Sequence, residues 1–344
     1  MEGKKNASIR DVARVAGVST ATVSRALSNP DILSERTRES VIAAIRETGY
    51  RVNRAARNLR TRRAGAVLVL VPNLGNPFFS HILAAISARF QNSGYSVLIT
   101  DSRDPAAAGH DYLDYFMDGR IDGMICLDGG LDPGVLARFR ASQFADRIVF
   151  ACEWSPEPSF ASVRSDNRAG AALAVRHLHG LGHRRIAHVK GPADNVLTEA
   201  RRAGMAAECA ALGLDLPPEW IIAGEFSLEA GRAAAAALLE LPNRPSAVFC
   251  ASDMVAFGLI SELTERGLRV PEDMSVMGFD DVEIAAYCQP PLTTIRQDRR
   301  QLGLRAAELL QERLDRAGAP SDAPGEIALV GTELVVRRST AAPR

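Results

Sequence analysis

The chain has 344 residues, of which 47% are hydrophobic and 24% charged, a composition that excludes a disordered or fibrous protein and a length that allows two or three domains. Its 41 Lys and Arg residues balance 41 Asp and Glu residues, but the charges are unevenly distributed. Residues 1–63, the head, hold 14 basic and 6 acidic residues, whereas the remaining 281 residues, the body, hold 27 and 35. This asymmetry predicts that the head alone binds a polyanion.

The five cysteines show no C-x-x-C spacing, so the sequence indicates neither a zinc cage nor a disulfide framework. The first six residues are polar and no apolar run follows them, which argues against a signal peptide. No stretch approaches 18 uninterrupted apolar residues, which argues against a membrane span. We therefore expect a cytoplasmic protein with reduced thiols.

Residues 8–50 have the pattern of three short helices. Ser8 and Asp11 form a capping-box pattern that begins the first helix, and Gly17 ends it in a left-handed conformation. Ser19 can cap the second helix and Ser34 the third. The apolar residues expected to share one core are Ile9, Val12, Ala13, Ala16, Val18, Val23, Ala26, Leu27, Val41, Ile42 and Ile45.

The second of these helices leaves Thr20, Ala21, Thr22, Ser24 and Arg25 facing outward beside a basic surface. Small polar side chains next to arginines are typical of a recognition helix, whose first residues read base edges in the major groove of DNA. The alternative is a small helical bundle with a solvated polar face.

Several motifs of the head lie at fixed spacings: Asp11-Val12-Ala13, Ala16-Gly17-Val18-Ser19, Thr22-Val23-Ser24-Arg25, Thr37-Arg38, Gly49-Tyr50 and Asn53. In these motifs the chain resembles the LacI/GalR family of bacterial transcription regulators, and the resemblance continues through the whole chain. It implies that Thr20 and Ala21 choose the operator sequence and that Arg25 reaches a base or a phosphate. It also implies DNA contacts for Ser8, Ser19, Thr22, Ser24, Asn53 and Arg54.

Residues 51–63 contain six arginines and four apolar residues, too few to order the segment by burial alone. The resemblance implies a hinge helix that folds on DNA, in which Leu59 wedges between bases of the minor groove. The alternative is a charged, flexible linker without a role in DNA readout.

The body alternates short aliphatic runs with amphipathic stretches, and the runs read as strands at 67–71, 97–99, 124–127, 148–151, 186–189, 247–250 and 275–279. This alternation predicts parallel sheets covered on both faces, with a single barrel as the alternative. The resemblance implies two doubly wound lobes, as in periplasmic binding proteins, with a ligand between them. The expected domains are residues 8–50, 51–63 and 65–344, with a first lobe of about 65–162 and 293–323 and a second of about 163–292 and 324–340.

The first half of the body places candidate ligand contacts after successive strands. Phe78 and Phe79 follow the first strand, and Asp101, Asp128 and Glu153 lie at or after the ends of the next three. An aromatic pair is more often part of a core, but these two occupy the family's effector-contact position. In the second half, the resemblance implies effector contacts for Arg201, Phe226, Ser252, Asp253, Asp280 and Gln297.

This set of side chains combines an arginine, several carboxylates and aromatic rings. Carboxylates accept hydrogen bonds from hydroxyl groups and an aromatic ring covers the apolar face of a sugar, so we expect a sugar or sugar derivative. A nucleobase or nucleoside is the alternative, because it suits the same rings. Ser252 and Met205 stand where the family usually has an asparagine and an aromatic residue, which leaves the identity of the ligand open.

No motif for catalysis, nucleotide phosphates or zinc is present, and glycines interrupt the pair His179 and His183. We therefore expect a transcriptional repressor rather than an enzyme, with neither metal nor cofactor. One head contacts few base pairs, so a homodimer that reads a pseudo-palindromic DNA operator is expected. A solute-binding transport protein is the rival for the body, and an enzyme on the same fold is the rival for the whole chain.

Overall fold

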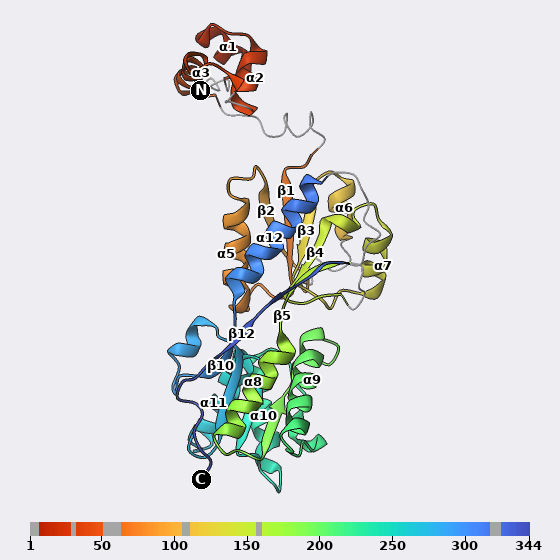
Figure 1. The fold of residues 1–344 in the computed structure, drawn as a ribbon, viewed down its shortest axis with the longest axis vertical. Helices are drawn as coiled ribbons and strands as arrows, with labels where there is room; N and C mark the ends of the chain where they lie inside the picture. Colours follow the sequence, from red (N-terminus) through yellow and green to blue (C-terminus); the bar gives the residue numbers. More distant parts are fainter. Residues whose placement is uncertain (1–6, 29–31, 51–62, 105–110, 156–159, 317–324) are drawn as a thin grey trace. The chain divides into compact units, whose positions relative to one another are not determined.

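The structure, a computed structural model, describes residues 7–28, 32–50, 63–104, 111–155, 160–316 and 325–344. The chain divides into two compact units, Met1–Arg63 and Ala64–Arg344, so the division by charge coincides with a division by contacts (Figure 1). Within the described ranges, no helix is both long enough and apolar enough to cross a membrane.

In its described residues the head has three helices, whose caps are those predicted. Asp11 Oδ2 accepts hydrogen bonds from the Ser8 backbone N–H at 2.9 Å and from the Ser8 hydroxyl at 2.7 Å. Ser19 Oγ accepts from the backbone N–H of Thr22 at 3.1 Å, and Gly17 ends the first helix with a φ of 67°. The helices are α1 (Ile9–Ala16), α2 (Thr20–Ser28) and α3 (Glu35–Thr48).

The core of the head differs from the predicted one at two positions. Leu27 and Ile42 are 37% and 42% exposed. Ile42 follows the fully buried Val41, and successive residues of a helix point in directions about 100° apart, so only one of them faces the core. Ala44 is buried and Tyr50 packs against the cluster, which completes the core without the other two side chains.

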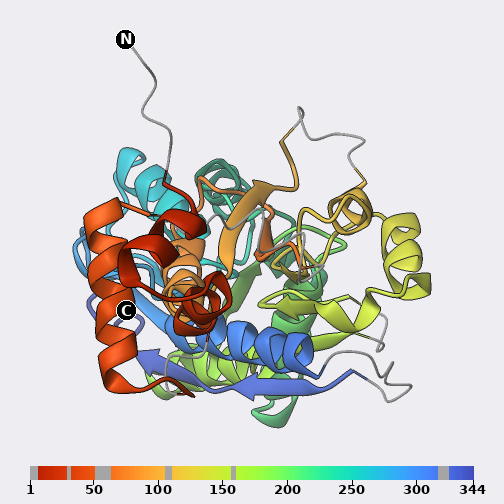
Figure 2. The same cartoon turned by 90° about the horizontal axis from the view of Figure 1, so that it is seen from above.

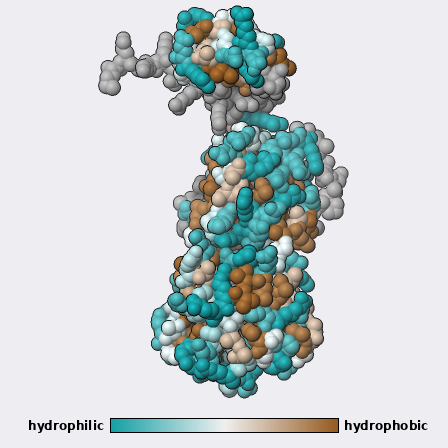
Figure 3. All heavy atoms as spheres, turned by 60° about the vertical axis from the view of Figure 1, so that its left-hand side comes forward, coloured by the Kyte–Doolittle hydropathy of each residue, from teal (hydrophilic) through white to brown (hydrophobic). Residues whose placement is uncertain are grey.

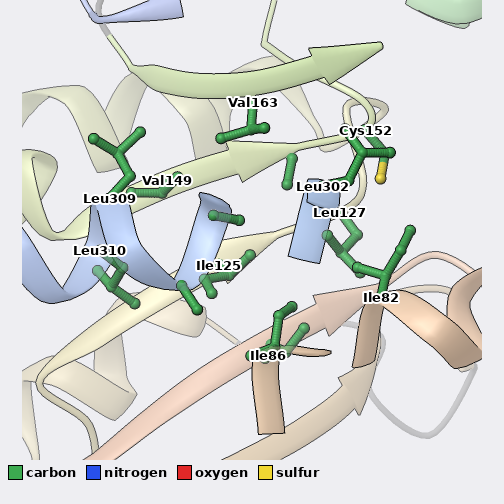
Figure 4. Packing of buried hydrophobic residues seen from close by; sticks show 14 of the residues in the cluster. Ile82, Ile86, Ile125, Leu127, Val149, Cys152, Val163, Leu302, Leu309 and Leu310 are labelled. Atoms are coloured by element: carbon green, nitrogen blue, oxygen red, sulfur yellow. The ribbon is translucent and has the colours of Figure 1, made fainter. Parts of the chain in front are cut away.

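The first sheet of the body is covered by helices on both faces. In β1 (Ala66–Val71), Val67 and Val69 face one apolar cluster, whereas Leu68 and Leu70 face another. Helices α5 and α12 cover the first face, where their isoleucines and leucines point onto the strands (Figure 4), and α6 and α7 cover the second. The other bounds are β2 (Ser96–Asp101), β3 (Gly123–Cys126), β4 (Ile148–Ala151), β5 (Ala161–Ser165), β11 (Ile327–Val330), α5 (Phe78–Phe90), α6 (Tyr112–Met117), α7 (Pro133–Ala141) and α12 (Arg299–Asp315).

The second sheet has the same layered construction. Helices α10 and α11 pack on one face and α8 and α9 on the other. The strand order is β11-β5-β4-β3-β1-β2 in the first sheet and β12-β10-β9-β8-β6-β7 in the second, and the β10–β12 pair is antiparallel. The bounds are α8 (Asn167–Gly180), β6 (Ile186–Val189), α9 (Val196–Ala211), β7 (Ile221–Ile222), α10 (Leu228–Glu240), β8 (Ala247–Cys250), α11 (Asp253–Glu265), β9 (Ser275–Asp280), β10 (Thr293–Gln297) and β12 (Thr332–Val335).

The chain crosses between the lobes three times, at points that differ from the expected lobe boundaries. Strands β5 and β11 belong to the first sheet and β10 to the second, so the crossings follow residues 165, 297 and 330 rather than 162, 292 and 323. Figure 1 shows the ribbon of β11 and β12 passing from the first lobe into the second, and Figure 2 shows the same continuous ribbon from above. The difference arises because each strand completes its pairing before the chain leaves the sheet, and pairing is a tertiary property.

Candidate functional site

The helix that the sequence predicts to read DNA is α2. Thr20, Ala21 and Arg25 are exposed, as a role in reading DNA requires. The hydroxyls of Ser19 and Thr22 lie 2.9 Å apart and take part in the cap of the helix. The remaining predicted DNA contacts of the hinge, Asn53, Arg54 and Leu59, lie outside the described residues.

A second candidate site lies between the two lobes of the body. The loops after β1 and β4 contribute from the first lobe, and α9, the segment before α10 and the end of β9 contribute from the second. These are the carboxyl ends of parallel strands, where α/β folds place their ligands. The lining residues are Asn76, Phe78, Phe79, Cys152, Glu153, Leu197, Arg201, Phe226 and Asp280.

Arg201 of α9 is the central cation of this cavity and is only 1% exposed. Its Nε donates to Asn167 Oδ1 at 2.8 Å, and its Nη1 donates to the carbonyl oxygen of Ala251. The guanidinium lies 3.8 Å above the centre of the Phe279 ring. Because these contacts fix its orientation, Nη2 is held toward Asp280, whose Oδ1 is 3.7 Å away.

Asp280 ends β9 and brings a carboxylate to the same cavity. Gln297 Nε2 donates to its Oδ1 at 2.7 Å. Burial raises the pKa of Asp280 to about 6, against the opposing effects of Arg201 and of the Gln297 hydrogen bond. The carboxylate can therefore accept hydrogen bonds from ligand hydroxyl or amine groups at neutral pH.

Glu153 faces the cavity from the first lobe and is 4% exposed. One of its oxygens accepts from the backbone N–H of Gly129 at 3.0 Å, and the polar side chain of Asn195, in the second lobe, acts to lower its pKa. Burial and the nearby Asp128 raise the pKa of Glu153 to about 7. The Glu153 carboxyl group therefore lies beside the cavity, fixed to the backbone of its own lobe, with a raised pKa.

Aromatic rings from both lobes line the cavity. Phe78 and Phe79 form an edge-to-face pair with ring centroids 5.2 Å apart, and Phe226 contributes from the second lobe. A Cβ atom at Gly191 would lie 2.3 Å from Phe226, so only glycine allows this ring its position. The free volume between these side chains is about 30 Å³, roughly the share of one water molecule, so a metabolite enters only if the lobes or the rings move apart.

The head and part of the body match known families. The model described as bacterial regulatory proteins, lacI family, matches residues 8–53, and the periplasmic binding protein-like domain matches residues 175–340. The HTH-type transcriptional repressor CytR of Escherichia coli (strain K12) is 39% identical over 345 residues, which cover 99% of each chain. The chain belongs to the lacI family of bacterial regulatory proteins.

Solved structures of this family share the fold of the chain. A lac repressor dimer bound to operator and the anti-inducer ONPF has a TM-score of 0.83 and 32% identity, over 98% of this chain and 100% of that one. A LacI family transcriptional regulator from Enterococcus faecium with bound ribose has a TM-score of 0.71 and 26% identity, over 81% of this chain and 100% of that one. The chain is therefore a DNA-binding transcriptional regulator and not an enzyme.

Five residues expected to bind the regulator's effector do not line the cavity. Asp253 is completely buried: its Oδ2 accepts from the Val282 N–H at 2.8 Å, and its Oδ1 accepts from Thr294. Ser252 caps α11 by accepting from the backbone N–H of Val255 at 3.3 Å. The Asp253 carboxylate and the Ser252 hydroxyl thus form hydrogen bonds within the second lobe. Gln297 does not line the cavity but donates a hydrogen bond to Asp280, which does.

Asp101 and Asp128 also have partners within the first lobe. Asp101 accepts from the backbone N–H groups of Leu74 and Arg103, each at 2.9 Å, in an open surface depression. Asp128 accepts from the Ser102 hydroxyl and from a backbone N–H of its own loop. A polar residue after a strand serves the turn as readily as a ligand, and sequence alone does not separate the two.

Three lining residues were missed by the sequence analysis. Asn76 belongs to the turn that delivers the two phenylalanines, and Cys152 directly precedes Glu153, so both lie beside motifs that were recognised. Leu197 lies in the first turn of α9, one turn before Arg201. Helical spacing of four residues from the predicted arginine is the signal that would have found it.

No metal centre is present in the parts of the chain that the structure describes, where no three His, Cys, Asp or Glu side chains come together. His183 is instead buried against the C-terminal segment, with Nδ1 2.8 Å from Ser246 Oγ and Nε2 2.8 Å from the carbonyl oxygen of Ala341. The sequence analysis expected glycines to interrupt the helix between His179 and His183. In the structure α8 continues through Gly180, and the left-handed residue that follows its end is Gly182, with a φ of 101°.

Proposed function

We propose that this regulator is a repressor whose affinity for a pseudo-palindromic operator is set by a nucleoside bound between the two lobes. The observation that carries the proposal is the composition of the interlobe cavity, which combines phenylalanine rings from both lobes with a few fixed polar groups. The full-length relative from Escherichia coli, named a transcriptional repressor, supports the direction of regulation.

The aromatic rings favour a nucleoside over a simple sugar. Phe78 and Phe79 from the first lobe and Phe226 from the second provide faces for a planar base, and stacking a base on an aromatic side chain contributes about 1–3 kcal/mol. Arg201 and Asp280 supply a donor and an acceptor for ribose hydroxyls or base edges. A sugar, the preference drawn from the sequence, remains the second candidate, since a ribose-bound regulator shares the fold.

DNA readout is assigned to the exposed face of α2. Thr20 and Ala21 stand at its beginning, where side chains reach base edges in the major groove, and Arg25 follows on the exposed surface. Leu59 of the hinge would enter the minor groove when paired hinges fold on the operator. The net positive charge of the head supports this assignment, since phosphate contacts supply much of the affinity.

The body carries an apolar surface that fits a second copy of the chain. A groove of about 890 Å³ runs between the start of α5, the outer side of α11 and the turn after β9. Tyr287 and Ile284 beside it are 77% and 58% exposed, and Figure 3 shows a large hydrophobic area on the second lobe. Patches of this kind mark interaction sites, and a two-fold symmetric operator requires paired heads.

The effector acts by changing the relative position of the lobes. The cavity has too little room for a nucleoside in the observed arrangement, so binding favours a different one. A ligand shifts such an equilibrium by its difference in affinity for the two arrangements, typically about 1–3 kcal/mol. The hinge preceding the first lobe transmits this shift to the head.

The proposal is tested by measuring the melting temperature of the purified protein with cytidine, uridine, adenosine, inosine, ribose and glucose. A ligand at about 100 times its Kd stabilises the folded state by about 2.7 kcal/mol, which shifts the melting temperature measurably. Nucleosides should raise it, and Phe226→Leu should reduce the rise. Stabilisation by a free sugar alone would replace the nucleoside with a sugar, and no response to any compound would refute an effector of either class.

A further inference from the structure

The effector carboxylate Asp280 is followed by a second aspartate that does not line the cavity. We propose that Asp281 is a positioning residue of the effector site: three arginines hold it in a left-handed turn, and this turn keeps the Asp280 carboxylate in the cavity. The inference rests on the proposed function, because it assigns to Asp281 an indirect role in effector binding.

Both residues have a positive φ, a backbone conformation that residues other than glycine rarely adopt. Asp280 has a φ of 125° and Asp281 a φ of 53°. A residue with a Cβ atom pays a conformational cost there and keeps the conformation only when its surroundings impose it. At residue 281 the surroundings are three arginine contacts, which suggests that the turn is imposed by charge.

Each arginine contacts a different atom of Asp281. Arg296 Nε donates to Oδ2 at 2.8 Å, and Arg337 Nη2 lies 2.7 Å from Oδ1. Arg299 Nη2 donates to the backbone carbonyl oxygen at 3.0 Å. The Asp281 side chain is only 10% exposed and that of Arg337 17%, so this pair is shielded from solvent more than an ordinary surface ion pair, whereas Arg296 is 46% exposed.

The arginines come from the segments that connect the lobes. Arg296 is in β10 and Arg299 is the first residue of α12, so they flank the crossing from the second lobe to the first. Arg337 follows β12, the strand reached by the last crossing, and its Nη1 donates to the Leu292 carbonyl oxygen at 2.8 Å. A rotation of the lobes about the crossings therefore moves at least one contact of Asp281.

The turn is also held by a buried hydrogen bond at the residue after Asp281, so we expect a substitution at Asp281 to leave the second lobe folded. The buried carboxylate of Asp253 accepts from the N–H of Val282, the next residue along the chain. Loss of the arginine contacts releases the turn at residue 281, so that Asp280 is held only through its side chain, by Gln297, while residue 282 remains tied to Asp253. The expected effect is a displaced Asp280 carboxylate in a folded body, rather than an unfolded lobe.

The test compares Asp281→Asn with Asp273→Asn in the full-length protein. Asparagine tolerates a left-handed φ, so the first change removes the charge without adding backbone strain. Asp273 also pairs with an arginine, Arg269, at 3.1 Å, but it lies on the surface away from the cavity and serves as the matched control. Adenosine and cytidine are the probes, titrated calorimetrically at a temperature at which all variants are folded.

We expect Asp281→Asn to weaken binding of whichever probe the parent protein binds by about tenfold, in the range found for coupled neighbouring groups, and Asp273→Asn to leave it unchanged. A merely structural role would lower the melting temperature without changing Kd below it. Hydrogen exchange of the ligand-free protein supplies a second readout, in which the peptide covering residues 278–284 exchanges faster only in Asp281→Asn.

Equal affinities in Asp281→Asn and the parent protein would overturn the proposal. If the parent protein binds neither nucleoside, the proposed effector class is wrong. Hydrogen exchange then tests the role of Asp281 by itself. Unchanged exchange of residues 278–284 in Asp281→Asn overturns that role, whereas faster exchange in this variant alone supports it. A loss of affinity in both variants would point to a general effect of charge and would likewise reject a specific role.

Discussion

Replacing Glu153 by glutamine should remove a large part of the pH dependence of the stability of the body. The Glu153 side chain is buried and its pKa is raised from 4.5 to about 7, chiefly by desolvation and then by Asp128. In the unfolded chain the carboxyl group ionises near its ordinary pKa. Between these two values the folded protein therefore holds more protons than the unfolded one, and its free energy of unfolding falls as the pH rises.

The size of the effect follows from the interval between the two pKa values. At about 1.4 kcal/mol for each pH unit, the interval from 4.5 to about 7 corresponds to a loss of about 3 kcal/mol between pH 4 and pH 8. Glutamine resembles the protonated form, so Glu153→Gln should match the parent protein near pH 4 and exceed its stability at pH 8. Asp280, whose pKa is raised to about 6, contributes in the same direction in both proteins.

Urea unfolding between pH 4 and pH 8 measures this difference. Both tryptophans, Trp154 and Trp220, lie in the body, so their fluorescence follows that unit without a contribution from the head. Glu240→Gln, at an exposed position at the end of α10, is the control and should run parallel to the parent protein. If the Glu153→Gln curve also runs parallel from pH 4 to pH 8, the assignment of a raised pKa to Glu153 is wrong.

Three further predictions concern the head, the packing of the second lobe and the dimer. Arg25→Ala should weaken specific operator binding by about 1–3 kcal/mol for each head while effector affinity stays intact, as measured by footprinting and calorimetry. Gly258→Ala places a Cβ atom 1.9 Å from a backbone oxygen of α10, so it should destabilise the body by about 1–3 kcal/mol, whereas Gly180→Ala meets no atom within 4 Å and should stabilise α8 by about 0.5–1 kcal/mol. Ile284→Asp should shift the dimer toward monomer in sedimentation experiments, and Ile327→Asp, at a similarly exposed isoleucine outside the groove, should not.

Each of these predictions has an outcome that contradicts it. An unaltered footprint with Arg25→Ala would remove α2 from DNA readout. Equal free energies of unfolding of Gly258→Ala and Gly180→Ala would mean that α10 and α11 move apart at Gly258 without loss of stability. A dimer that survives Ile284→Asp, or dissociates equally with Ile327→Asp, would move the interface away from the apolar groove.

Much of the head could be predicted from local sequence because its helices begin and end at residues with specific backbone preferences. Serine caps and left-handed glycines act within three or four residues, so the pattern around Ser8, Gly17 and Ser19 defined the helices directly. Seven strands of the body were predicted because each contains a short aliphatic run, namely β1, β2, β3, β4, β6, β8 and β9. The two-residue strand β7 and the polar strands β5 and β10 were missed because they lack this hydrophobic signal, and β11 was missed although its residues are apolar.

Motifs and charge in the amino-acid sequence were enough to predict the family, the charge division between head and body, and six of the residues that line the interlobe cavity. Which carboxylates are available to a ligand depends on the fold: Asp280 and Glu153 face the cavity, whereas Asp253 holds a neighbouring turn. The same residue type follows several strands, and its role depends on which backbone N–H groups come within hydrogen-bonding distance. Those distances are set by the pairing of strands far apart in the chain, which local sequence does not encode.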